Sequence, residues 1–310
     1  LWIGALERLI RWDKKNDRIK FFYYYAAPIW SGGESVELRS LCRDKKGKIW
    51  VSAWGEGLAV LNEAKGQFTK SPRDPSLARA VKSNLIFDLY APSDGNIWVG
   101  SAAGVYTINP ATLKITSYTN HPVLKKLEGL RVYSLLEDRK GNVWMATNNG
   151  VYYYDRAAHR LDNYTEKEGL VFNQCLTLFL DQRGLLYAGS VKGFSIIANG
   201  KIRTYTKDNG LKYDYCEGIT EDDRGKIWIA NTKCLIRFEP ERGIMKFFDE
   251  NSGLTTDGFR FGSNLKSRSG ELFWGSRTGI NYFYPDQLIS RQADLKVNIY
   301  QADAPNSTLF

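Results

Sequence analysis

The chain has 310 residues, enough for two ordinary domains or for one large all-β domain. Hydrophobic residues make up 43% and charged residues 25%, so disorder over most of the length is excluded. No run of about 18 apolar residues is present, and neither end resembles a signal peptide; we expect any targeting sequence to lie outside this sequence. Two histidines and four cysteines without a C-x-x-C pair argue against a metal centre, and no cofactor is indicated.

One phrase recurs along the whole chain: a polar turn ending in Gly, then an aromatic residue, then a small residue two positions later. Examples are DKKGKIWVS at 44–52, DRKGNVWMA at 138–146 and DDRGKIWIA at 222–230. The aromatics recur every 41 to 48 residues, and they are Trp2, Trp50, Trp98, Trp144, Tyr187, Trp228 and Phe273. A β-type repeat with a period in the forties is typical of a β-propeller, and seven units are countable.

Each repeat is predicted to form four antiparallel strands. The first strand, for example 132–138, leads into the Asp-x-x-Gly turn, whose Gly supplies the positive φ that a tight hairpin needs. The second strand carries the aromatic, and the small residue shares its face because side chains alternate with period two. We infer that the small residue lets the next blade pack closely. The third and fourth strands follow, the fourth with the polar alternation of an edge strand.

The two ends of the repeat pattern differ from its middle. The sequence begins inside a second strand, so the first blade is expected to lack its first strand. The predicted fold class is therefore all-β, a seven-bladed propeller over residues 1–286 with an incomplete first blade. Residues 287–310 are expected to supply an outer strand or to begin a following domain.

The repeated phrase, with lead-in loops such as EGLVFNQC at 168–175, resembles the two-component regulator propeller repeat. The last unit, residues 257–288, resembles the closing blade of such propellers, which in that family is followed by a Y_Y_Y-type β-sandwich. The resemblance implies the periplasmic sensor region of a hybrid two-component system. In such proteins a membrane span and a histidine kinase follow, and the usual task is to detect glycan fragments and control glycan-utilisation genes.

Candidate ligand-binding residues lie in two sets of loops that a propeller places on one face: those before the first strand and those between the second and third strands. Aromatic rings beside amides and charges suit a sugar, whose C–H face stacks and whose hydroxyls form hydrogen bonds. The candidates are Trp54, Arg131, Tyr133, Asn148, Asn173, Lys192, Asp214, Tyr215, Arg260 and Arg277. Solvation of the loops or docking of a neighbouring domain would use the same residue types.

The other conspicuous residues have simpler interpretations. The seven second-strand aromatics are expected to pack in the core, because they repeat so regularly. Cys175 and Cys216 occupy equivalent apolar first-strand positions and are expected to be buried thiols, although a disulfide among these, Cys42 and Cys234 stays open. The net charge of +9 follows the turns and not a single groove, which argues against nucleic acid and leaves attraction to anionic lipid or an acidic glycan open.

Three function classes remain. The first is a sensor that binds an oligosaccharide or another small ligand, without catalytic residues in this fragment; a homodimer and contacts to a neighbouring propeller or sandwich are expected in the full receptor. The second is a structural dimerisation or docking scaffold. The third is a propeller lyase or glycosidase, which is disfavoured because neither His121 nor His159 has a suitable place and no carboxylate pair is marked.

Overall fold

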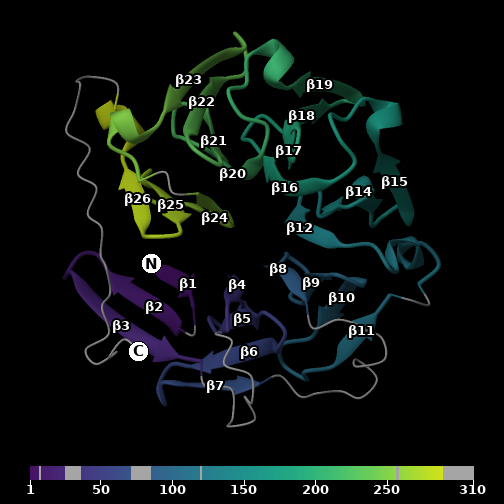
Figure 1. The fold of residues 1–310 in the computed structure, drawn as a ribbon. Coiled ribbons are helices and arrows are strands. Elements are labelled where there is room, and N and C mark those ends of the chain that lie inside the picture. Colours follow the sequence, from purple (N-terminus) through teal and green to yellow (C-terminus); the bar gives the residue numbers. More distant parts are fainter. Residues whose placement is uncertain (7, 25–35, 71–84, 119–120, 256–257, 289–310) are drawn as a thin grey trace. The chain divides into compact units, whose positions relative to one another are not determined.

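The computed structural model describes residues 1–6, 8–24, 36–70, 85–118, 121–255 and 258–288 (Figure 1). The described chain divides into two compact units, which meet in sequence between Tyr164 and Thr165. The predicted C-terminal segment, apart from its first two residues, lies outside the described residues. The described helices are short 3-10 turns, and none is long and apolar enough to span a membrane.

The first unit contains four antiparallel sheets, the first of three strands and the others of four. Their strands are β1 (Trp2–Ala5), β2 (Arg8–Asp13) and β3 (Arg18–Tyr23); β4 (Leu38–Arg43), β5 (Ile49–Ala53), β6 (Gly57–Asn62) and β7 (Gln67–Lys70); β8 (Ile86–Tyr90), β9 (Ile97–Ser101), β10 (Gly104–Ile108) and β11 (Ile115–Ser117); and β12 (Val132–Glu137), β13 (Val143–Thr147), β14 (Gly150–Asp155) and β15 (Arg160–Tyr164).

The second unit contains three such sheets, the last with three strands. Their strands are β16 (Cys175–Leu180), β17 (Leu186–Ser190), β18 (Gly193–Ala198) and β19 (Lys201–Tyr205); β20 (Cys216–Glu221), β21 (Ile227–Asn231), β22 (Leu235–Glu239) and β23 (Ile244–Phe248); and β24 (Phe259–Lys266), β25 (Leu272–Ser276) and β26 (Ile280–Phe283). Each sheet is a meander of sequential strands. The predicted all-β, seven-bladed propeller with a three-stranded first blade is confirmed.

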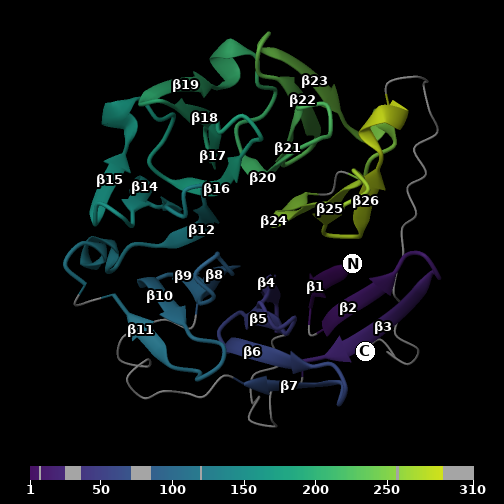
Figure 2. The ribbon, with the colours of Figure 1, turned by 180° about the vertical axis from the view of Figure 1, so that it is seen from behind.

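Within each unit the first strands of successive blades lie side by side, as both ribbon views show (Figures 1 and 2): β4, β8 and β12 in the first unit, β16, β20 and β24 in the second. Polar side chains link them. Asp88 accepts from Ser40 Oγ of the preceding blade at 3.1 Å and from the Leu135 amide of the following blade at 2.8 Å. In the second unit Asn264 Nδ2 donates to the Ile219 carbonyl at 2.9 Å.

The recurring Asp of the turn explains why the phrase recurs. Asp222 Oδ1 accepts from two turn amides, both at 2.9 Å, while its Oδ2 accepts from Trp228 Nε1 at 2.8 Å. Asp44 holds Trp50 in the same way. A carboxylate that joins the turn to the buried indole fixes both at once, because each buried polar group then has a partner.

The small residue after the aromatic lets the next blade approach, as inferred. A Cβ at Gly100 would lie 2.7 Å from the Val132 carbonyl oxygen of the next blade, and one at Gly189 would lie 2.8 Å from Cys216 Cβ. The last blade differs, because a Cβ at Gly275 would meet Ser263 of its own blade, 2.8 Å away.

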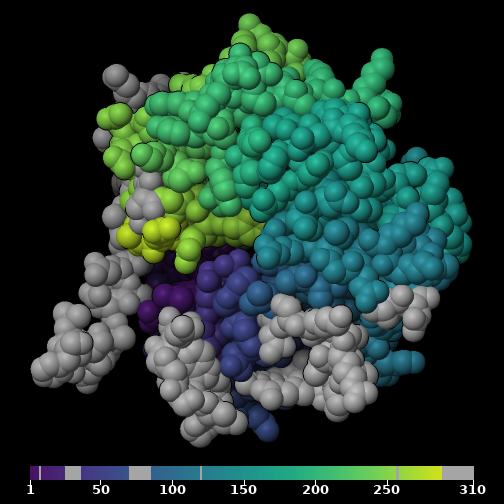
Figure 3. Space-filling view, turned by 45° about the vertical axis from the view of Figure 1, so that its right-hand side comes forward, coloured from purple at the N-terminus to yellow at the C-terminus, as the bar shows by residue number. Residues whose placement is uncertain are grey.

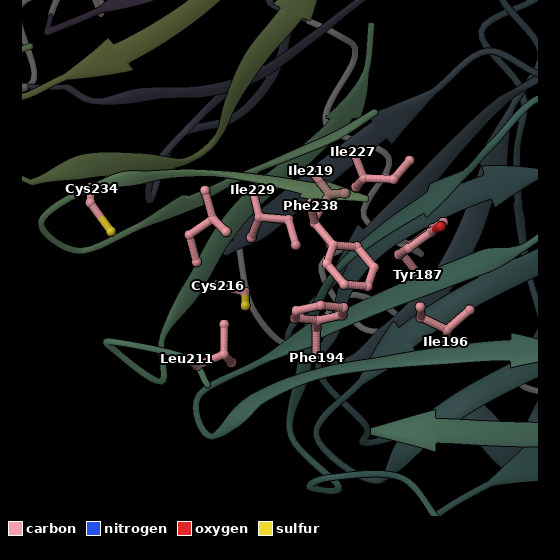
Figure 4. Packing of buried hydrophobic residues seen from close by; sticks show 11 residues of the cluster. Tyr187, Phe194, Ile196, Leu211, Cys216, Ile219, Ile227, Ile229, Cys234 and Phe238 are labelled. Atoms are coloured by element: carbon pink, nitrogen blue, oxygen red, sulfur yellow. The ribbon is translucent and has the colours of Figure 1, made fainter. Parts of the chain in front are cut away.

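Apolar side chains pack between neighbouring sheets of a unit. The space-filling view shows the described strands covered by closely packed atoms (Figure 3). In the second unit, Phe194 and Phe238 meet edge to face, with ring centroids 5.4 Å apart (Figure 4). Tyr187, Cys216 and Ile229 belong to the same fully buried cluster. The repeated aromatic of the second strand is thus part of the core.

Three loops of the second unit, each leading from one blade to the next, share the same type of turn. Each is a single 3-10 turn that begins with a reciprocal capping box, at Thr165, Thr206 and Asp249, and ends at a glycine of positive φ. The apolar residue after that glycine, such as Leu211, is buried. These turns fix the start of the loops that carry several of the candidate residues.

Candidate functional site

Each described first strand, which is β4, β8, β12, β16, β20 or β24, contains a β-bulge near its start. In β12, for example, Val132 pairs with Thr147 and Ser134 with Ala146, so the strand register shifts at Tyr133. A bulge re-aims the side chain of its extra residue, and bulges recur next to binding sites. In five of these strands the bulge has a single extra residue: Arg39, Phe87, Tyr133, Leu176 and Glu217. The sixth first strand, β24, has a larger register shift between Phe259 and Asn264.

In the first unit three bulge residues join Trp54 in a continuous row. The Arg39 guanidinium carbon lies 3.9 Å from the centroid of the Trp54 ring, within cation–π range. The Trp54 ring meets Phe87 edge-on at 5.7 Å, and Phe87 meets Tyr133 at 4.9 Å between centroids. We call Arg39, Trp54, Phe87 and Tyr133 the aromatic row. It spans three successive blades.

The row is open to solvent at one end and anchored at the other. Trp54 and Phe87 are half-buried, while Tyr133 is buried. At the solvent end Arg39 lies 3.7 Å from the Glu37 carboxylate. The row therefore offers half-buried ring surface, with the exposed Arg39 side chain lying over one face of the Trp54 ring.

Arg131, two residues before Tyr133, is paired with a second predicted residue, Asn148. The Arg131 amide donates to Asn148 Oδ1 at 2.8 Å, and the Asn148 amide donates to the Arg131 carbonyl at 3.2 Å. Both side chains are exposed. Asn148 thus fastens the loop before β12, and its Oδ1 is already engaged by protein.

Two predicted residues of the second unit have local structural roles. Asn173 exchanges hydrogen bonds with Glu166: its Oδ1 accepts from the Glu166 amide and its own amide donates to Glu166 Oε1, both at 2.9 Å. The exposed Lys192 ammonium lies 4.2 Å from the centroid of the Phe172 ring. Asn173 is therefore a loop-fastening residue, and Lys192 covers an aromatic ring of the same blade.

The next two candidates neighbour each other in sequence but differ in their surroundings. The half-buried Asp214 forms an ion pair with Lys207 at 2.8 Å. The Tyr215 side chain is exposed by 38%, among the most exposed large apolar side chains of the described chain. The described ion pair of Asp214 is thus to Lys207 and not to another candidate.

The last two candidates, Arg260 and Arg277, act electrostatically on a residue that the prediction did not include. Glu217 is half-buried, and both guanidinium groups act electrostatically on its carboxylate. Burial raises the pKa of Glu217 to about 7, because the desolvation of its charged form outweighs the attraction of the two arginines. We call Glu217, Arg260 and Arg277 the charged cluster.

The second-strand aromatics do not form a binding ring. Trp50, Tyr187 and Trp228 are fully buried, as expected of core residues, and Trp144 stacks on the Tyr164 ring, with centroids 5.9 Å apart. His121 is equally structural: its Nδ1 accepts from the Val123 and Leu124 amides.

The four cysteines are free thiols in this structure, which answers the open question of a disulfide. Cys175 and Cys216 are buried at the expected first-strand positions. Burial raises the pKa of each to about 12, so both stay protonated at neutral pH. Among the described residues no group of three or more His, Cys, Asp or Glu side chains is arranged to hold a metal ion.

Sequence analysis missed Arg39, Phe87 and the site role of Glu217, although a usable signal was present. All three occupy the second position of a first strand, the position that also holds Tyr133 and Arg260, which were selected. Comparing that position across the repeats would have identified them. The bulge that directs their side chains leaves no distinct residue type in the sequence.

Residues 126–149, which include β12 and β13, match a family model described as two component regulator propeller. No curated protein matches the sequence.

Solved structures share the fold. The extracellular domain of BT3049 from B. thetaiotaomicron, described as a hybrid two component system, is 22% identical with a TM-score of 0.67, over 79% of this chain and 32% of that one. PorZ, a surface component of the type-IX secretion system of Porphyromonas gingivalis, is 16% identical with a TM-score of 0.66, over 91% and 43%. Virginiamycin B lyase from Staphylococcus aureus is 15% identical with a TM-score of 0.62, over 80% of each chain.

At these identities the likenesses show the fold alone, and the chain spans about a third of the BT3049 domain. The family match is independent of them and falls where the turn, the aromatic and the small residue of the phrase are all present. The chain is therefore a seven-bladed β-propeller that contains a two-component regulator propeller repeat of the kind predicted from its sequence.

Proposed function

We propose that this propeller is the extracytoplasmic ligand-binding region of a hybrid two-component signal transduction protein, and that its ligand is a glycan fragment. The observation that carries the proposal is the aromatic row, in which bulges on β4, β8 and β12 gather side chains from three blades around Trp54. A row of rings with a guanidinium stacked on one of them suits a sugar, which presents both C–H faces and hydroxyls.

The family match and the fold support the sensor class. The match to the two component regulator propeller links the chain to signalling proteins, and BT3049 is a structural neighbour described as a hybrid two component system. In the whole protein we expect a periplasmic position, a homodimer, and contacts of this propeller with a neighbouring propeller or sandwich. Kinase activity and control of glycan-utilisation genes would belong to residues beyond this sequence.

A ligand in the row would act by favouring one of two arrangements of the receptor. A ligand shifts such an equilibrium only by its difference in affinity for the two states. Trp54 lies in the β5–β6 turn and Arg39 in β4, so a ligand on the row contacts a turn and first strands together. Movement of the turn against these strands is the local change that we expect the receptor to use.

The test is a screen of defined oligosaccharides against the 310-residue chain by thermal shift, followed by calorimetric titration of those that raise the melting temperature. Trp54→Ala is expected to weaken binding of the best ligand about tenfold, since loss of one stacking ring removes roughly 1–2 kcal/mol. Tyr23→Ala is the matched control: it removes a ring that is 41% exposed on β3, outside the row, and should change the Kd less than about twofold.

The outcomes separate the three function classes. A raised melting temperature with intact ligand supports the sensor, and shortened oligosaccharides in the recovered sample would establish an enzyme instead. A screen in which no glycan stabilises the chain would favour the scaffold. Equal weakening by Trp54→Ala and Tyr23→Ala would show that the ligand does not bind at the aromatic row.

A further inference from the structure

The charged cluster of the second unit is built at a distortion of the last blade. Phe259 pairs with Ser276 and Asn264 with Trp274, so residues 260–263 of β24 face only Gly275 of β25. The other first strands accommodate a single extra residue. The enlarged bulge begins at Arg260, and Ser263 Oγ returns a hydrogen bond to the Arg260 carbonyl at 2.9 Å.

The turn that follows β25 brings Arg277 to the start of β24. The Arg277 amide donates to the Gly258 carbonyl at 3.2 Å, and its side chain runs along Gly258, where an added Cβ would lie 3.7 Å from Arg277 Nε. Gly258 has a φ of +104°, a conformation that favours glycine. The backbone conformation therefore favours glycine at position 258, whereas a Cβ there would meet Arg277 only in ordinary van der Waals contact.

Glu217 reaches the cluster from the neighbouring blade. It occupies the bulge of β20, and Gly218 beside it lies against the Asn264 side chain of β24, where a Cβ would clash. Within the described chain Glu217 makes no hydrogen bond or ion pair, and no described carboxylate forms an ion pair with Arg277. A half-buried carboxylate thus lies in the field of two guanidinium groups without an ion pair to either.

We propose that Arg260, Arg277 and Glu217 form a binding site for an oxyanion group of an acidic saccharide, either a uronic acid carboxylate or a sulfate ester. A guanidinium presents several N–H donors in a plane and matches both groups. The saccharide part of this inference rests on the proposed function, whereas the anion site rests on the cluster alone.

The role of Glu217 follows from charge. An anion between the arginines would repel an ionised Glu217, so the site binds with Glu217 protonated and able to donate a hydrogen bond. The charged groups that act on Glu217 are Arg260 of β24 and Arg277 after β25, and its own strand adds the Cys216 thiol, which stays protonated. Leu176, at the matching position of β16, carries no charge.

The experiment titrates the 310-residue chain calorimetrically with trigalacturonate, with inorganic sulfate and with neutral galactotriose, at pH 6 and pH 8. We expect one of the two anions to bind and galactotriose to bind at least tenfold more weakly at this site. Binding of trigalacturonate but not of sulfate would identify a uronic acid carboxylate as the ligand group. Binding of sulfate but not of trigalacturonate would identify a sulfate ester.

Variants then locate the site. Arg277→Gln is expected to weaken anion binding about tenfold or more, because a charged hydrogen-bond donor is lost. Arg203→Gln removes the same charge from the exposed face of β19 and should change the Kd less than about twofold. Equal loss in both variants would show diffuse attraction and would overturn the proposal.

The pH dependence gives a readout that a merely structural role would not produce. Anion affinity should rise several-fold from pH 8 to pH 6 as Glu217 takes up its proton, while Glu217→Gln should bind as tightly at pH 8 as at pH 6. A wild-type affinity independent of pH would contradict the role of Glu217.

If neutral glycans bind through Trp54 but neither anion binds, this inference fails and the proposed function stands. If sulfate binds but no saccharide does, the anion site stands and the proposed glycan ligand fails.

Discussion

At the scale of single residues, Asp88 shows how a first-strand carboxylate holds blades together. Its two oxygens accept from Ser40 and from the Leu135 amide, one from each neighbouring blade. Burial nevertheless raises its pKa to about 6, because desolvation outweighs these hydrogen bonds. The residue therefore connects β4, β8 and β12 while its charged form is disfavoured.

The sign of its pH effect follows from the raised pKa. The folded state binds this proton more tightly than the unfolded chain, so the free energy of unfolding should rise as the pH falls from about 7 towards 5. Relative to Asp88→Asn, which does not titrate, the wild type should gain on the order of 1 kcal/mol between pH 7.5 and pH 5. Urea unfolding of both proteins at the two pH values measures this difference. Parallel pH dependence of the two would contradict the assignment.

Single residues also mark where sequence analysis succeeded and where it stopped. Trp54 and Tyr133 were selected by residue type and loop position, and the structure brings them together through Phe87. Phe87 itself looked like an ordinary strand residue. The alternation of side chains assigns a residue to the correct face only where the strand is regular. The bulge between Ile86 and Asp88 changes that assignment.

At the scale of elements, the Asp-to-Trp turn is the unit that the sequence repeats most faithfully. Its hydrogen bonds explain the fixed spacing in Asp44 to Trp50 and in Asp222 to Trp228. Asp94 reaches Trp98 Nε1 at 2.9 Å from a shorter turn, so the contact persists where the spacing does not. The turn and strand order could therefore be predicted, because both depend on local chemistry.

Removing this carboxylate should destabilise its blade. Asp222→Ala leaves the buried Trp228 Nε1 and two turn amides without their acceptor, and we expect a loss of about 3 kcal/mol, since each hydrogen bond to a charged group contributes roughly 1.5–3 kcal/mol. Asp223→Ala is the control, because its exposed ion pair with Lys266 is worth at most about 1 kcal/mol. Chemical denaturation measures both, and a smaller loss for Asp222→Ala than for Asp223→Ala would refute the role of the turn.

At the scale of the whole molecule, the net charge of +9 acts on any anionic ligand before it reaches a specific site. Repeat period and blade number were predictable from the recurring phrase, and the three-stranded first blade was predictable because the sequence begins inside a second strand. The ligand sites were not predictable, since they use residues that differ from one repeat to the next at the same structural position. Net attraction and specific recognition must therefore be separated by experiment.

The dependence on salt concentration separates net electrostatic attraction from specific recognition. Raising NaCl from about 0.1 M to about 1 M shortens the Debye length from about 10 Å to about 3 Å and screens the long-range attraction. We expect the association rate of an acidic oligosaccharide to fall roughly tenfold, while the affinity of a neutral one for the aromatic row changes less than about twofold, because ring stacking involves no net charge. Surface plasmon resonance with both ligands on the 310-residue chain measures the two effects. A neutral ligand that lost affinity as steeply as the acidic one would show that recognition at the row depends on charge, and so on Arg39 more than on Trp54.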